Sequence, residues 1–115
     1  MKDMRGLLNE HTEELRSLNY SPVTLRQIRD VGLSFIRELE EHGVAEPGAI
    51  RAGHVRQWQR GLASRPSNRG KPLSPRTLAK HAEVVRGFMA FLAARGLVQP
   101  ALAAAGPGYT LAGLN

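Results

Sequence analysis

Two stretches of the chain, residues 21–43 and 74–96, follow the same helical pattern from start to end. Each begins with Ser-Pro, in which the serine caps a helix and the proline occupies its first turn. Each ends at a glycine, the residue that most easily takes the left-handed conformation after a helix. The identical pairs are Ser21/Ser74, Pro22/Pro75, Thr24/Thr77, Leu25/Leu78, Val31/Val84, Phe35/Phe88, Leu39/Leu92 and Gly43/Gly96. This repeat predicts two equivalent amphipathic helices, and it constrains the fold more than any other feature.

Apolar residues elsewhere also recur at helical spacings of three and four, and no stretch alternates as a strand would. A first helix is predicted over residues 3–18, with an inward face made of Met4, Leu7, Leu8, His11, Leu15 and Leu18. A short third helix is predicted over residues 52–64, with Val55, Trp58 and Leu62 on one side. We expect Trp58, Phe88, Met89 and Phe91 to be core residues, although Met89 or Phe91 facing a partner domain is an alternative. The sequence predicts an all-α protein of four helices.

The chain is long enough for one domain with its own core. Residues 65–72 are polar and rich in Pro and Gly, a composition that predicts a loop. We expect the domain to cover residues 1–102 and a linker to cover residues 103–115. The absence of cysteine excludes disulfides and thiolate metal sites, and no apolar stretch approaches the roughly 20 residues that span a bilayer. We therefore expect a cytoplasmic protein that needs no membrane and no cofactor.

Charge is distributed unevenly along the chain. Residues 1–50 contain 6 basic and 9 acidic residues, whereas residues 51–86 contain 9 basic residues and only Glu83 as an acid. A concentrated positive segment is what a surface needs to bind a polyanion, because neutralised phosphates release their counterions. The segment indicates a nucleic-acid ligand. A surface whose arginines serve only solubility is the alternative.

Short motifs occur in a fixed order along the chain. They are Tyr-Ser-Pro-x-Thr-Leu at 20–25, Glu-x-x-Gly at 40–43, Leu-Ser-Pro-x-Thr at 73–77, Arg-x-Phe-Met-x-Phe-Leu-x-x-x-Gly-Leu at 86–97, and Pro-Ala at 100–101. In this order the chain, over residues 5–102, resembles the N-terminal core-binding domain of tyrosine recombinases of the phage integrase family. The resemblance implies a SAM-like four-helix bundle made of two helix hairpins.

The resemblance stops at two points. Helix three of the family begins with Thr or Asp followed by Pro-Glu, whereas this chain has Arg51, Ala52 and Gly53 there. The catalytic His-x-x-Arg motif is missing, and neither Tyr20 nor Tyr109 lies in a context like that of the family's nucleophile. Metal clusters, nucleophile–base pairs and phosphate-cradling glycine loops are also missing from the sequence. We therefore expect no catalysis by this chain and expect a parent recombinase to supply a catalytic domain.

The resemblance also implies where DNA is bound. In the family this domain covers one side of the duplex with the N-terminal halves of its second and fourth helices, within a tetramer of neighbouring protomers. Helical geometry places basic and polar residues on the outer stripes of the same two helices. Ser21 and Ser74 are expected to be caps. The candidate DNA-binding residues are Thr24, Arg26, Gln27, Arg69, Lys71, Arg76, Thr77, Lys80, His81 and Arg86.

Two other functions fit the same sequence. A helical protein–protein interaction module would keep the four helices and use an exposed apolar patch, such as the Ala-rich residues 101–105. A stand-alone DNA-binding accessory protein would use the same basic helix without a catalytic partner. Salt-dependent binding of duplex DNA separates the first alternative from the recombinase hypothesis.

Overall fold

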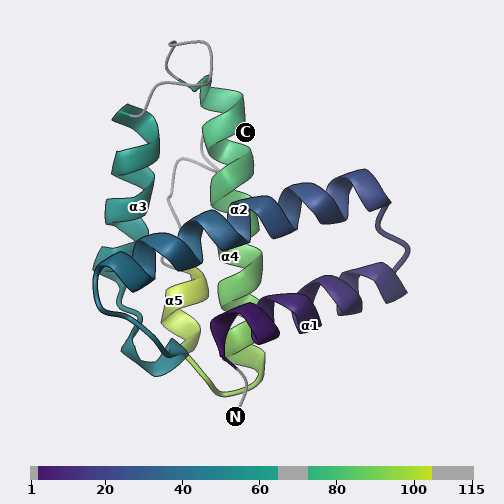
Figure 1. The fold of residues 1–115 in the computed structure, drawn as a ribbon, viewed down its shortest axis with the longest axis horizontal. Coiled ribbons are helices and arrows are strands. Elements are labelled where there is room, and N and C mark those ends of the chain that lie inside the picture. Colours follow the sequence, from purple (N-terminus) through teal and green to yellow (C-terminus); the bar gives the residue numbers. More distant parts are fainter. Residues whose placement is uncertain (1–2, 65–72, 105–115) are drawn as a thin grey trace.

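The computed structural model describes residues 3–64 and 73–104, and helices account for most of them (Figure 1). The elements are α1 (Met4–Ser17), α2 (Pro22–Glu41), the 3-10 turn η1 (Pro47–Ala49), α3 (Ala52–Ser64), α4 (Pro75–Ala94) and α5 (Pro100–Ala104). The described ranges contain no strand, which confirms the predicted all-α class. The predicted bounds of the four long helices agree with these elements to within two residues.

The repeated helix starts and ends take the predicted conformation. Ser21 Oγ accepts the backbone N–H of Thr24 at 3.2 Å, and Ser74 Oγ accepts that of Thr77 at the same distance. Gly43 and Gly96 have φ values of +77° and +72°, in the left-handed region that glycine adopts without strain. Both serines are therefore N-caps, as expected.

Helix α3 starts at Ala52 even though it lacks the Thr or Asp cap found in the family that the sequence resembles. The backbone N–H of Arg51 donates to Nδ1 of His54 at 2.9 Å. His54 stands at the third helical position, where a capping box places Glu or Gln for the same contact. A histidine thus makes the contact that Glu or Gln makes in a capping box, so α3 can begin without the usual sequence signal.

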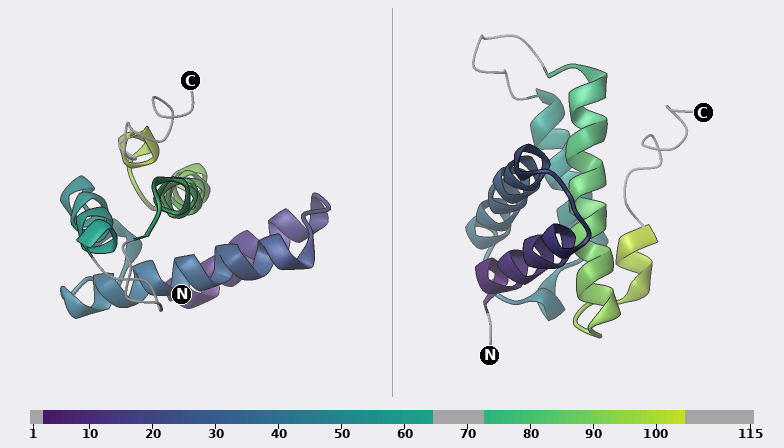
Figure 2. Two further views of the ribbon diagram at one scale, coloured as in Figure 1. Left: turned by 90° about the horizontal axis from the view of Figure 1, so that it is seen from above. Right: turned by 90° about the vertical axis from the view of Figure 1, so that its right-hand side faces the viewer.

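The helices form two pairs. Helices α1 and α2 make a hairpin that runs across α3 and α4, which are seen end-on in the left panel of Figure 2. The side chains of Phe35 and Phe88, the repeat partners on α2 and α4, are 0% exposed. Trp58 from α3 meets Phe35 edge-on with the ring centroids 5.5 Å apart, so Trp58 is a core residue as predicted.

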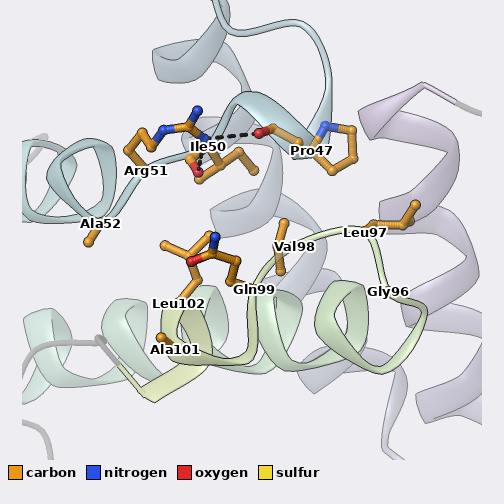
Figure 3. Close-up of a pocket in the computed structure, with 11 residues that line it drawn as sticks. Pro47, Ile50, Arg51, Ala52, Gly96, Leu97, Val98, Gln99, Ala101 and Leu102 are labelled. Atoms are coloured by element: carbon orange, nitrogen blue, oxygen red, sulfur yellow. Dashed lines mark hydrogen bonds between the residues drawn. The ribbon is translucent and has the colours of Figure 1, made fainter.

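A fifth helix extends the predicted set. Helix α5 begins with proline at Pro100 and continues to Ala104 beside the C-terminal half of α4. It therefore includes the first two residues of the predicted linker 103–115, and residues 105–115 lie outside the described part of the chain. Leu102 and Val98 are each 8% exposed and belong to the core. A pocket of about 560 Å³ lies between η1, the start of α3 and the segment that leads into α5 (Figure 3). At its rim the Arg51 guanidinium donates to the carbonyls of Gly48 and Ile50, at 2.9 and 3.2 Å.

Leu18 departs from the predicted inward face of the first helix. It is the C-cap of α1 and its side chain is 67% exposed. The hairpin turn projects past the other helices in Figure 1, so none of the described elements covers it. The apolar spacing of the first helix therefore continues one turn past the last residue that packs against the core.

His11 is one of two buried polar residues of α1, with Thr12, and is 8% exposed. Its ring lies 5.0 Å from that of Phe91 and 5.8 Å from that of Phe88, both on α4. Burial in this apolar setting lowers the pKa of His11 below the ordinary value of 6.5, and Glu14 opposes this effect only in part. The folded protein therefore favours the neutral ring.

Acidification is expected to destabilise the fold through His11. At pH values between the pKa of His11 in the folded chain and its pKa in the unfolded chain, the unfolded chain binds a proton at His11 and the folded chain does not. The contribution of His11 to stability is therefore complete above about pH 6.5 and is lost as the pH falls to the folded value. Urea unfolding at about pH 7.5 and about pH 5.5 measures this loss. The loss should shrink in His11→Phe but persist in His42→Gln, a change at an exposed histidine; equal losses in all three proteins would refute the assignment.

Candidate nucleic-acid interface

A groove of about 1030 Å³ lies between the middle of α2 and the N-terminal half of α4. Figure 1 shows α2 passing over α4 in this region. The groove is lined by Gln27, Asp30, Val31, Pro75, Arg76, Thr77, Ala79, Lys80, His81, Glu83 and Val84. It brings together five of the ten candidates from the sequence, namely Gln27, Arg76, Thr77, Lys80 and His81. We call it the α2–α4 groove.

The α2–α4 groove carries both signs of charge. Arg76 and Lys80 are exposed on α4, and within the described part of the chain neither forms an ion pair. Asp30 and Glu83 are exposed on the same walls. Guanidinium and ammonium groups bind phosphates, while carboxylates accept hydrogen bonds from cytosine amino groups in the major groove. The groove therefore offers cationic donors together with acceptors that a purely phosphate-binding surface lacks.

The cap of α4 leaves one hydroxyl proton available in this groove. Ser74 Oγ accepts the Thr77 N–H and donates to Thr77 Oγ1 at 3.0 Å. The serine hydroxyl is thus consumed by the cap, whereas the threonine oxygen only accepts. None of the hydrogen bonds among the described residues uses the Thr77 hydroxyl as a donor, and Thr77 lines the groove near the positive end of the α4 dipole. A hydroxyl in this position suits a phosphate oxygen.

His81 lies half-buried in the wall of the groove, one turn after Thr77. Its Nδ1 is 2.9 Å from the Thr77 carbonyl oxygen, which can only accept, so Nδ1 carries the proton. Its ring lies 6.3 Å from that of Trp58, which packs behind it. Neutral His81 therefore keeps an acceptor at Nε2 and is held in one orientation by α4 and α3.

The remaining candidates do not line this groove. Thr24 repeats the Thr77 geometry, with Ser21 Oγ donating to its Oγ1 at 2.9 Å, but it stands at the start of α2. Arg26 lines a different groove, on the side of α2 that faces α1. Arg86 is half-buried and already has a partner within the chain. Arg69 and Lys71 lie outside the described residues.

The structure adds Asp30 and Glu83 to the candidate site. Helical spacing places both on the outer stripes of α2 and α4. They were not among the predicted DNA-binding residues because they are acidic. Both line the α2–α4 groove together with Gln27, Arg76 and Lys80. Ala79, a small residue, also lines this groove.

No family model, no curated protein and no solved structure matches this chain. Within residues 3–64 and 73–104, no group of three or more His, Asp or Glu side chains is arranged to hold a metal ion. Over the same ranges, no helix is both long enough and apolar enough to cross a membrane.

Proposed function

We propose that this chain binds double-stranded DNA as the N-terminal clamp domain of a tyrosine site-specific recombinase. One observation carries the proposal: residues selected on two separate helices, from the sequence, converge on the α2–α4 groove. The groove combines the groups that phosphates and base edges require, which are two cations, a free hydroxyl, an amide and an imidazole. In this proposal α1–α4 form the SAM-like core-binding domain and the groove faces the duplex.

The proposal assigns the chemistry of strand transfer to a separate catalytic domain. That domain and the neighbouring protomers of a recombinase tetramer are the partners that complete the clamp. Because the chain covers one side of the duplex, it binds DNA more weakly than a complete clamp does. The expected activity of this chain alone is DNA binding dominated by phosphate contacts.

A titration of labelled duplex DNA at several salt concentrations tests the proposal. Binding should weaken steeply between about 50 and about 200 mM salt. The variant Arg76→Ala/Lys80→Ala should bind more weakly, and the slope of log K against log salt should fall by about 0.9 for each phosphate contact removed. Fluorescence anisotropy supplies both quantities.

The matched control removes two arginines from the same basic segment. Arg56 and Arg60 are exposed on α3 and do not line the α2–α4 groove. Arg56→Ala/Arg60→Ala should retain most of the affinity and the salt slope. DNA binding that is absent or insensitive to salt would reject the proposal, and so would equal losses in the two double variants.

A further inference from the structure

The turn between α1 and α2 exposes a cluster of large apolar side chains. Leu18, Tyr20 and Val23 are 67%, 44% and 63% exposed. In the described part of the chain Leu97, at 37%, is the one other exposed large apolar residue. We call residues 18–23 the hairpin tip. Single exposed apolar residues are ordinary, but three of them within residues 18–23 indicate a contact surface. In Figure 1 the hairpin tip projects beyond the other helices, where a partner can reach it from several sides.

A basic groove of about 470 Å³ adjoins the hairpin tip. It is lined by Thr12, Arg16, Tyr20, Pro22, Leu25, Arg26 and Arg29, and we call it the tip groove. Three arginines therefore line a groove beside the hairpin tip, and Tyr20 belongs to both.

Few groups inside the protein compensate these arginines. Arg16 has one exposed ion pair with Glu13 at 3.3 Å, which is worth little in water. Arg29 donates to the neutral side chain of Asn9 at 3.3 Å. Within the described residues Arg26 has neither an ion pair nor a hydrogen bond. The tip groove is therefore a cationic surface with capacity for a further anion.

We propose that the hairpin tip and the tip groove together bind an acidic, partly apolar peptide segment of a partner protein. Carboxylates of the segment pair with the arginines, and one of its apolar side chains covers the hairpin tip. A nucleic-acid backbone satisfies the guanidinium groups but leaves the aliphatic side chains in water. Arginine and tyrosine are the residues that protein interfaces favour, and both occur here beside exposed Leu and Val.

This surface is separate from the α2–α4 groove. Gln27 and Asp30 line that groove, whereas Arg26 and Arg29 line the tip groove on the side of α2 toward α1. The two grooves share no lining residue. The peptide contact therefore goes beyond the proposed DNA binding, and the two can be tested independently.

Fluorescence anisotropy with a synthetic probe tests the proposal. The probe is a labelled amphipathic peptide with leucine and phenylalanine on one helical face and glutamate on the other. It should bind the intact chain, and it should bind poorly when its glutamates become glutamine or its apolar residues become serine. Arg26→Glu and Val23→Glu should each weaken binding by about tenfold or more. Both positions are exposed, and circular dichroism melting checks that the variants fold.

Arg37→Glu is the matched control, because Arg37 is exposed on α2 and lines neither groove. Equal weakening by Arg37→Glu and Arg26→Glu would reduce the effect to net charge and overturn the proposal. Loss of duplex DNA binding without loss of peptide binding in Arg26→Glu would assign the surface to DNA instead. Light scattering that shows a dimer broken by Val23→Glu would make a second copy of this chain the occupant. Either result contradicts a peptide partner. The proposed DNA binding by the α2–α4 groove is tested separately, by Arg76→Ala/Lys80→Ala.

Discussion

Replacing Phe88 with alanine will lower the free energy of unfolding by about 3–5 kcal/mol. The side chain is 0% exposed on the face of α4 that meets α1. Its ring lies 5.8 Å from that of His11 on α1 and 6.3 Å from that of Phe91 on α4. Truncation therefore leaves a cavity between α1 and α4 that relaxation of the surrounding structure fills only in part. A domain of this size has a total stability of roughly 5–15 kcal/mol, and the loss therefore approaches global unfolding.

The repeat gives this prediction a matched counterpart. Phe35 stands at the equivalent position of α2, is also 0% exposed, and meets Trp58 edge-on. Phe35→Ala should cost about the same 3–5 kcal/mol. Urea unfolding measures both, with Val23→Ala as an exposed control that should change stability by less than about 0.5 kcal/mol. A loss below about 1 kcal/mol for either phenylalanine would show that the equivalence of the two helices is not structural.

Helix ends were predictable because their signals are local. A serine followed by proline satisfies the first N–H groups of α2 and α4 from within the same turn. Gly43 and Gly96 end those helices through their own backbone freedom. None of these contacts depends on the rest of the fold, so the sequence contains all the information that they need.

Features that depend on neighbouring elements were not predictable. Leu18 fits the apolar period of α1, and only the position of the hairpin turn past the core decides that it is exposed. Helix α5 is too short to show a period, and it is held by the packing of Leu102 and Val98. The capping role of His54 at the start of α3 also escapes any pattern built on acidic residues.

The candidate site shows the same division. Helical spacing placed Arg76 and Lys80 on one outer stripe, and the structure brings them together with Thr77 in one groove. Helical spacing does not indicate which side of α2 faces α4 and which side faces α1. Gln27 and Arg26 are adjacent in sequence, about 100° apart around the helix, and line different grooves. Assigning them requires the crossing of α2 over α4, which only tertiary structure supplies.

The α1–α2 hairpin requires a close approach of the two helices at Gly32, and this gives the second large prediction. A Cβ atom at Gly32 would lie 2.7 and 2.9 Å from the two terminal carbons of Leu8, whose side chain is 1% exposed. Gly32→Leu should therefore destabilise the fold by about 3 kcal/mol, the upper range for overpacking, even though glycine is a poor helix former. Gly61→Leu is the matched control within α3, where nothing lies within 4 Å of the added Cβ. It should leave stability unchanged or raise it by up to about 1 kcal/mol.

A double substitution separates steric crowding from any other effect at Gly32. Leu8→Ala alone should cost about 2–5 kcal/mol through the cavity it leaves. Combining it with Gly32→Leu moves the large side chain from α1 to α2 and roughly conserves the volume between them. The double variant should therefore be more stable than the sum of the two single losses implies, by about 1–3 kcal/mol in a double-mutant cycle. Additive losses would mean that the two helices do not meet at this point, and the α1–α2 hairpin that positions both grooves would then have to be placed differently.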